Sequence, residues 1–133
     1  MDIGDYHQVI ALWDSTPGIG LSGADSKTGI SQFLNRNPGQ NFVVCEGERI
    51  VGAVLCGNDG RRGYIHHLVV HSAHRGLGLG RALVARCLEA LASAGIQKCH
   101  LFVYKDNLEG IAFWKEIGWT ERVELQMMSK ELG

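Results

Sequence analysis

A glycine-alternating segment in the middle of the chain has the residue types of a phosphate-binding loop. It follows an apolar stretch that ends at His71, and its members are Arg75, Gly76, Leu77, Gly78, Leu79, Gly80 and Arg81. The start of a helix leaves backbone N–H groups without partners and carries a partial positive charge, so small residues there let phosphate oxygens approach. The two arginines add donors that bind phosphate in a bidentate manner. The segment therefore predicts a site for a phosphorylated ligand.

Two familiar phosphate motifs do not fit this segment. A dinucleotide fingerprint G-x-G-x-x-G would need glycine at its sixth position, but that position is Arg81 when counted from Gly76 and Leu83 when counted from Gly78. A P-loop needs Lys followed by Ser or Thr at the helix start, and neither is present. A strand-to-helix turn that holds no ligand stays open as the plainer alternative.

The charge around this segment is uneven. Residues 61–86 contain no Asp or Glu, although the whole chain has a net charge of only -1. The window contains Arg61, Arg62, Arg75, Arg81, Arg86, His66, His67, His71 and His74. An anionic ligand, a solvated basic face and an RNA-binding surface all fit such a window. Because the net charge gives no general attraction to nucleic acid or anionic lipid, we expect no nucleic-acid and no membrane partner. The histidines lack nearby Cys or acidic ligands, so no metal site is predicted.

Length and composition bound the fold. The 133 residues, 45% of them hydrophobic and 20% charged, indicate one globular domain over residues 1–133. No apolar run is long enough to span a bilayer and no secretion signal is recognisable, so we expect a cytoplasmic protein. The cysteines, at positions 45, 56, 87 and 99, lie in apolar segments without metal-binding spacing and are interpreted as core residues.

Hydrophobic periodicity predicts the elements that would position the loop. Helices are expected over residues 5–13, 27–36, 79–94 and 108–117, and strands over 41–45, 49–56, 64–71, 98–103 and 121–128. This order predicts an α/β sandwich with an antiparallel hairpin followed by a strand-helix-strand unit. Only Met1–Ile3 precede the first helix, so the sheet edge is expected to be short or completed by a partner chain, as in a homodimer. Residues 15–40 are interpreted as a lid, with Asp25 as its main ionic contact for an acceptor.

Two motifs together resemble the GNAT N-acetyltransferase superfamily. The first is R-x-x-G-x-G at Arg75–Gly80, and the second is Asn107 followed by Ile111–Trp119, where the family typically has N-x-x-A-x-x-[LF]-Y-x-x-x-G-F. The resemblance implies a mixed, mostly antiparallel sheet with a central splayed parallel strand pair and about four flanking helices. It also implies an acetyl-CoA-dependent enzyme that moves the acetyl group to a primary amine by direct attack in a ternary complex. A non-catalytic acyl-CoA sensor is the alternative.

The resemblance also implies roles for individual residues. Backbone groups of Leu68, Val69 and Val70 would pair with the pantetheine arm, and Arg75–Arg81 would wrap the pyrophosphate of coenzyme A. Asn107 would flank the cofactor. Trp114 stands where the family has a tyrosine that serves the leaving thiolate, and an indole is only a hydrogen-bond donor. Trp114 is therefore either a contact of the sulfur or a core aromatic residue.

An imidazole is the predicted base. His66 is named because imidazole as a group titrates near neutrality and because strand alternation puts it on one face with Tyr64 and Leu68, whereas His67 is expected to point the other way. Some family members are similar in carrying paired histidines on this strand, and Tyr64 stands in the place of the second one. Tyr64 would orient a water. A buried, hydrogen-bonded histidine is the alternative for His66. The acceptor is expected to be a small-molecule amine or a protein amino group.

Overall fold

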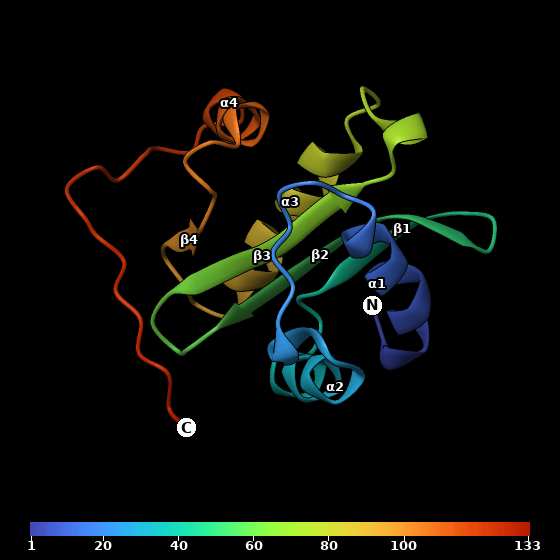
Figure 1. Cartoon of the computed structure of the whole chain (residues 1–133), viewed down its shortest axis with the longest axis horizontal. Helices are drawn as coiled ribbons and strands as arrows, with labels where there is room; N and C mark the ends of the chain where they lie inside the picture. The colour runs from blue at the N-terminus through green and yellow to red at the C-terminus, as the bar shows by residue number, and fades with distance from the viewer. The chain divides into compact units, whose positions relative to one another are not determined.

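Residues 1–133 are described by a computed structural model. They form two compact units, Met1–Phe102 and Val103–Gly133. The larger unit contains three α-helices and the sheet, and the smaller one contains the fourth helix (Figure 1). The helices are α1 (Tyr6–Asp14), α2 (Lys27–Arg36), α3 (Leu79–Ser93) and α4 (Leu108–Glu116). Short 3-10 helices are η1 (Ile3–Asp5), η2 (Gly23–Asp25) and η3 (Ser72–His74). No helix is both long and apolar enough to cross a membrane.

The sheet has four strands in the order β1-β2-β3-β4. Its strands are β1 (Phe42–Glu46), β2 (Arg49–Asn58), β3 (Gly63–Val70) and β4 (Cys99–Leu101). The first two pairs are antiparallel, and β3 pairs with β4 in parallel only from Gly63 to Ile65. Beyond Ile65, β3 continues to Val70 with no strand on that edge. The predicted fold, a mixed sheet with a splayed parallel pair and four helices, is confirmed.

Helices cover both faces of the sheet in the larger unit (Figure 1). On one face α1 and α2 contribute Val9, Trp13 and Ile30 to a core that includes Leu55 and Val69. Burying a side chain of this size stabilises the fold by about 1.5–3 kcal/mol. On the other face α3 packs so closely that a Cβ at Gly63 would lie 2.5 Å from Leu91 Cδ1. Glycine at this position lets the helix approach β3 directly.

The predicted elements agree with the structure except at the C-terminus. The helix over residues 27–36 is found with the predicted bounds, and the hairpin and the other helices shift by a residue or two. The strand over residues 98–103 is shorter than predicted, and no strand is found over 121–128. There Leu125 N–H bonds back to Arg122 O at 3.3 Å, which makes a turn. The apolar alternation of 121–128 has no partner strand, so the prediction was wrong.

Candidate functional site

The far half of β3 presents unpaired backbone groups along one edge. His71 N–H donates to Val51 O at 2.7 Å, on the β2 side. Because neighbouring backbone groups in a strand point to alternate sides, the N–H groups of Leu68 and Val70 face the opposite edge. On that edge β4 has already ended at Leu101. An extended ligand can therefore pair with β3 as an added strand.

The glycine loop follows the free edge after the short helix η3. Gly76 has φ +80° and Gly78 has φ +79°, a left-handed conformation that other residues adopt only at a cost. Gly78 is the N-cap of α3, and no side chain caps this helix. A Cβ at either glycine would meet nothing within 4 Å. The first N–H groups of α3 are consequently left for solvent or an anion, with open space above the loop.

The predicted cations border this loop. Arg75 Nε donates to Val70 O at 3.2 Å, so the guanidinium lies at the end of the free edge of β3. Arg81 is exposed in the first turn of α3, and Leu77, 69% exposed, projects from the loop. Leu79 and Gly80 are half-buried where the helix begins. Strand edge, loop, helix start and both arginines thus form one continuous surface that suits a linear ligand with a phosphorylated end.

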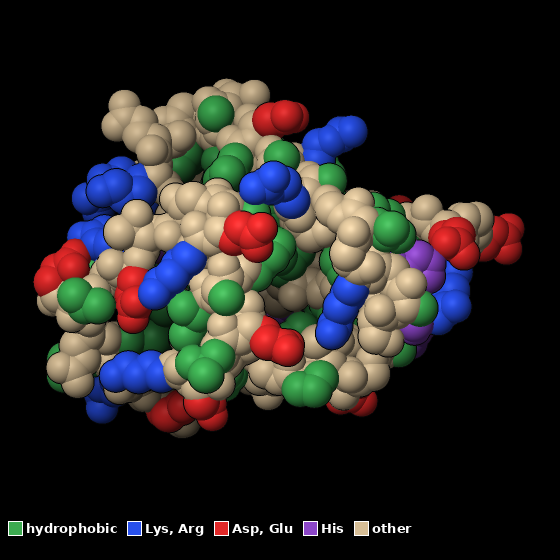
Figure 2. All heavy atoms as spheres, turned by 90° about the horizontal axis from the view of Figure 1, so that it is seen from above, with side chains coloured by type: hydrophobic (Ala, Val, Ile, Leu, Met, Phe, Trp, Pro, Cys, Tyr) green, Lys and Arg blue, Asp and Glu red, His purple; other side chains and the backbone are tan.

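Carboxylates from other parts of the chain lie close to two histidines of the acid-free window, residues 61–86. His74 Nε2 lies 2.8 Å from Glu46 Oε2, and His67 Nε2 lies 2.9 Å from Asp25 Oδ1. Both carboxylates come from outside residues 61–86. On the face drawn in Figure 2, Lys and Arg side chains are interspersed with Asp and Glu side chains. These carboxylate–histidine contacts weaken the case for a broad basic surface and leave the glycine loop as the better anion site.

Both histidines of β3 lie on the side covered by α1 and α2. The His66 ring packs edge-on against Phe33 of α2, with ring centroids 5.9 Å apart, and is stacked with Tyr64 at 6.4 Å. His67 packs against Trp13 of α1 at 5.0 Å. The expectation that His67 points the other way was wrong. The register of β3 against β2 shifts between Ala53 and Leu55, and His67 adopts φ +52°, so a β-bulge turns two successive side chains to one side.

The surroundings of His66 favour its neutral form. Burial is the main cause that lowers the pKa of His66, the neighbouring His67 lowers it further, and Asp25 opposes both. No hydrogen bond to either ring nitrogen of His66 is formed within the chain. The imidazole is therefore unprotonated at pH 7, but nothing fixes which nitrogen carries its hydrogen.

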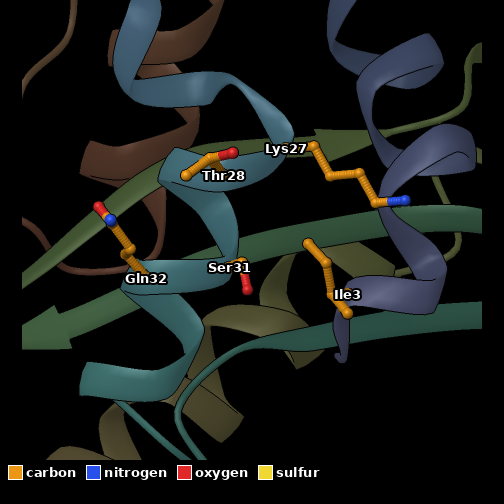
Figure 3. A pocket seen from close by; sticks show the side chains of 5 residues that line it. All are labelled: Ile3, Lys27, Thr28, Ser31 and Gln32. Carbon is orange, nitrogen blue, oxygen red and sulfur yellow. The ribbon is translucent and has the colours of Figure 1, made fainter.

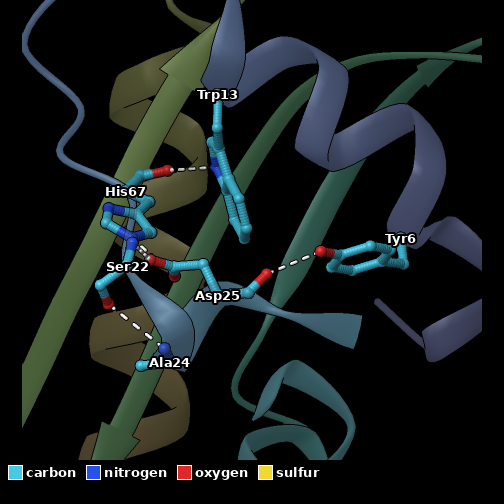
Figure 4. Close-up of polar contacts among 6 residues, drawn as sticks. All are labelled: Tyr6, Trp13, Ser22, Ala24, Asp25 and His67. Atoms are coloured by element: carbon cyan, nitrogen blue, oxygen red, sulfur yellow. Dashed lines mark hydrogen bonds and ion pairs between the residues drawn. The ribbon is translucent and has the colours of Figure 1, made fainter. Parts of the chain in front are cut away.

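Asp25 is a buried residue of this site, and its carboxylate is bonded within the chain. It was expected to be an ionic contact for an acceptor, yet it is only 7% exposed and its carboxylate is bonded to His67 and to Ser22 N–H, the latter at 3.0 Å (Figure 4). Trp13 Nε1 donates to His67 O at 3.1 Å in the same cluster. No spacing rule could have paired residues so far apart in the chain.

Asn107 and Trp114 belong to the smaller unit. The Asn107 side chain accepts a hydrogen bond from Gly110 N–H at 3.0 Å and so caps α4. Trp114 packs edge-on against Phe113 at 5.2 Å and Trp119 at 5.1 Å. Within this unit Asn107 therefore has a structural role as an N-cap, and Trp114 is part of an aromatic cluster.

Two cavities at the surface of the larger unit do not include the histidines of β3. One, of about 300 Å³, is lined by Ile3 and by side chains from the first turns of α2 (Figure 3). The other, of about 260 Å³, lies between α1 and the start of β2 and includes His71. Neither contains the glycine loop, because an unpaired strand edge and an open loop form a surface and not a cavity.

Comparisons with known proteins agree with this geometry. Residues 7–119 match the model of the acetyltransferase (GNAT) family. An acetyltransferase of Pectobacterium atrosepticum is 33% identical over 128 residues, which cover 96% of this chain and 89% of that protein. An aminoglycoside 6'-N-acetyltransferase of Acinetobacter haemolyticus superposes with a TM-score of 0.77 at 14% identity, covering 98% of this chain and 94% of the other. The NatC complex bound to Gag peptide and CoA gives a TM-score of 0.76 at 20% identity, covering 92% of this chain and 82% of the other. The matched sequence, the shared fold and the site geometry agree: the chain belongs to the acetyltransferase (GNAT) family.

Proposed function

We propose that this protein is an N-acetyltransferase that moves the acetyl group of acetyl-CoA to a primary amine by direct attack in a ternary complex. One observation carries the proposal. The unpaired edge of β3 is followed, after the single turn of η3, by an uncapped, glycine-rich helix start. Such a surface suits a ligand with an extended amide-bearing arm and a pyrophosphate, which is the chemistry of coenzyme A.

The residues present suit acetyl-CoA as the acetyl donor. Leu68 and Val70 offer backbone N–H groups to the pantetheine amides, and the backbone at Val69 keeps them in register. Gly76–Gly80 and the first N–H groups of α3 would hold the pyrophosphate, and Arg75 and Arg81 would neutralise its charge. An N–H at Leu68 is the proposed donor to the carbonyl oxygen that becomes negative during attack.

The amine must lose a proton for the transfer to proceed. A lysine-type amine has a pKa near 10.4, so producing its neutral form at pH 7 costs about 4–5 kcal/mol. We assign the proton to an imidazole of the His66–His67 pair on β3, the former being the predicted base. Tyr64, stacked on His66, is proposed to orient a water beside it.

The leaving thiolate has no tyrosine partner at the usual family position. Trp114 occupies it, and an indole N–H can donate a hydrogen bond to sulfur but cannot release a proton at neutral pH. Trp114 and Asn107 are accordingly proposed as cofactor contacts without an acid role. We also propose that both compact units belong to one acyltransferase domain, because the family match over residues 7–119 spans them.

The acceptor is proposed to be a small-molecule amine or a protein amino group. Proteins of the same fold whose names specify an aminoglycoside or a bound peptide suggest which acceptors to test. The test is thiol release from acetyl-CoA in the presence of a polyamine, an aminoglycoside, an amino acid and a peptide with a free amino terminus. Amine-dependent release supports the proposal. Tight coenzyme A binding without release for any acceptor of the panel would favour the sensor instead.

A further inference from the structure

Asp25 and His67 form a carboxylate–imidazole pair at the bulge of β3. Asp25 ends η2, and its side chain is 9% exposed, with Oδ1 2.9 Å from His67 Nε2. Its second oxygen accepts Ser22 N–H, and its backbone carbonyl accepts the Tyr6 hydroxyl at 2.7 Å (Figure 4). The residue is therefore held through its backbone carbonyl and through Oδ2, and Oδ1 faces His67.

This contact fixes the tautomer of His67. An ionised carboxylate only accepts hydrogen bonds, so Nε2 of the imidazole must carry the hydrogen. In the neutral ring Nδ1 then has the lone pair. Nδ1 has no partner within the chain and is not sealed from solvent, since the His67 side chain is 20% exposed. The contact with Asp25 therefore leaves Nδ1 of His67 as the basic nitrogen and fixes the orientation of the ring.

The backbone of His67 is fixed as well. It is the chain's one residue other than glycine with a positive φ, +52°. Its carbonyl accepts Trp13 Nε1 at 3.1 Å, while its ring contacts the same indole. Strained residues of this kind persist where the surroundings hold them firmly, and they are common at functional sites.

His66 lacks these features. Its ring makes no hydrogen bond within the chain, and burial lowers its pKa, which makes it a weaker base. His67 has a carboxylate that stabilises the imidazolium formed when the ring takes up a proton. This arrangement of an acid, an oriented imidazole and a free nitrogen is the one that general-base catalysis needs.

We propose that Nδ1 of His67, oriented by Asp25, accepts the proton of the acceptor amine during the acetyl transfer proposed above, on which this inference rests. The amine nitrogen bonds to the acetyl carbon and the carbonyl electron pair moves to oxygen, giving a tetrahedral oxyanion. When the carbonyl re-forms, the carbon–sulfur bond breaks and its electron pair leaves with sulfur. The amine proton goes to Nδ1 and from there, through solvent, to the thiolate. His67 is the catalytic residue, and Asp25 is a positioning residue.

The Asp25→Asn variant separates positioning from folding. The amide has the shape of the carboxylate, but its NH₂ group would donate to Nε2 and move the ring hydrogen to Nδ1, where no proton can then be accepted. We expect turnover to fall about 10²–10⁴-fold with the acetyl-CoA KM unchanged. Nitrogen-15 NMR of the imidazoles should show the His67 hydrogen on Nε2 in the wild type and on Nδ1 in the variant.

Two further variants complete the test. His67→Gln keeps a donor toward Asp25 and should lose turnover to the same degree while binding coenzyme A normally. Glu46→Gln alters another carboxylate–histidine pair, the one with His74, and should leave turnover unchanged.

The following results would decide against the inference. Near wild-type turnover of Asp25→Asn or His67→Gln would overturn it, and so would a wild-type tautomer with hydrogen on Nδ1. A wild type that releases no thiol with spermidine, kanamycin or a free-amino-terminal peptide would instead remove the proposed function, and the inference with it.

Discussion

Replacing Gly78 with Ala should weaken coenzyme A binding in addition to destabilising the fold. Gly78 has φ +79°, and a Cβ there meets no atom within 4 Å, so only the backbone conformation opposes the change. A left-handed conformation costs a residue with a Cβ about 1–2 kcal/mol. For a chain of this length such a loss lowers Tm by about 3–10 °C.

Gly95 is a matched control. It follows α3 at its other end, has φ +83°, and a Cβ there also meets nothing within 4 Å. Gly95→Ala should therefore cost the same 1–2 kcal/mol or so of stability. The two glycines are separated by the length of α3, about 22 Å, so Gly95 cannot touch a ligand at the helix start.

Isothermal titration with coenzyme A, alongside thermal unfolding, measures both effects. We expect Gly78→Ala to raise the Kd at least about tenfold, a loss of ~1.4 kcal/mol or more, because the added methyl group fills the space above the loop. Gly95→Ala should bind as the wild type does. Equal Kd values for the two variants would refute the assignment of the glycine loop as the pyrophosphate site.

Three further predictions concern thiols, pH and the segment that carries Asp25. Cys45 is exposed and should react at once with a thiol reagent, whereas burial raises the pKa of Cys99 to about 12, so that it should react only slowly until the chain unfolds; equal rates would contradict this. Because the folded state lowers the pKa of His66, the unfolded state binds more protons below about pH 6.5, and stability should fall as pH drops through this range. The free energy of unfolding, measured with urea, should differ less between pH 5 and pH 8 for His66→Gln than for the wild type. An equal difference for the two proteins would count against a buried neutral ring at His66. Gly29→Ala would force its Cβ against the carbonyl of Ala24 in η2; we expect a loss of about 1–3 kcal/mol in denaturant unfolding and slower turnover, with coenzyme A binding retained.

Local patterns made much of the fold predictable. The helix at 27–36 has a serine N-cap at Ser26, whose side chain accepts Gly29 N–H, and an asparagine directly after it. The hairpin over 41–56 combines apolar runs with a tight Glu46-Gly47-Glu48 turn. The strand-to-helix turn at the glycine loop was predictable for the same reason, because left-handed turns and helix starts favour particular residue types at a few adjacent positions.

Features that depend on distant parts of the chain were not predictable. The bulge at His67 is an extra residue in β3 relative to β2, and strict alternation along one strand cannot detect it. Residues 61–86 contain no acid, but Asp25 and Glu46 from outside this window lie against two of its histidines. The acid-free sequence therefore overstated the positive charge of this region. The core role expected for all four cysteines was wrong for Cys45, because it lies beside the register shift of β1, on the exposed side.

The strand expected at residues 121–128 is absent for a different reason. Alternating apolar residues such as Val123, Leu125 and Met127 suit one face of a strand, but a strand is stable only when its backbone groups find a partner. These side chains are exposed, and the segment begins with a turn and not with hydrogen bonds to a neighbouring strand. Side-chain periodicity alone does not predict whether a pairing edge exists.

The most direct test of the central claim measures coenzyme A thiol and acetylated amine together, by thiol titration and mass spectrometry, for the wild type and Gly78→Glu. Pre-reacting Cys45 removes the protein's own fast thiol from the signal. We predict one thiol for each acetyl group gained by at least one amine of the panel, and no release by Gly78→Glu, whose side chain fills the loop and adds negative charge. Unaltered release by Gly78→Glu, or thiol release that does not depend on an amine, would contradict the account.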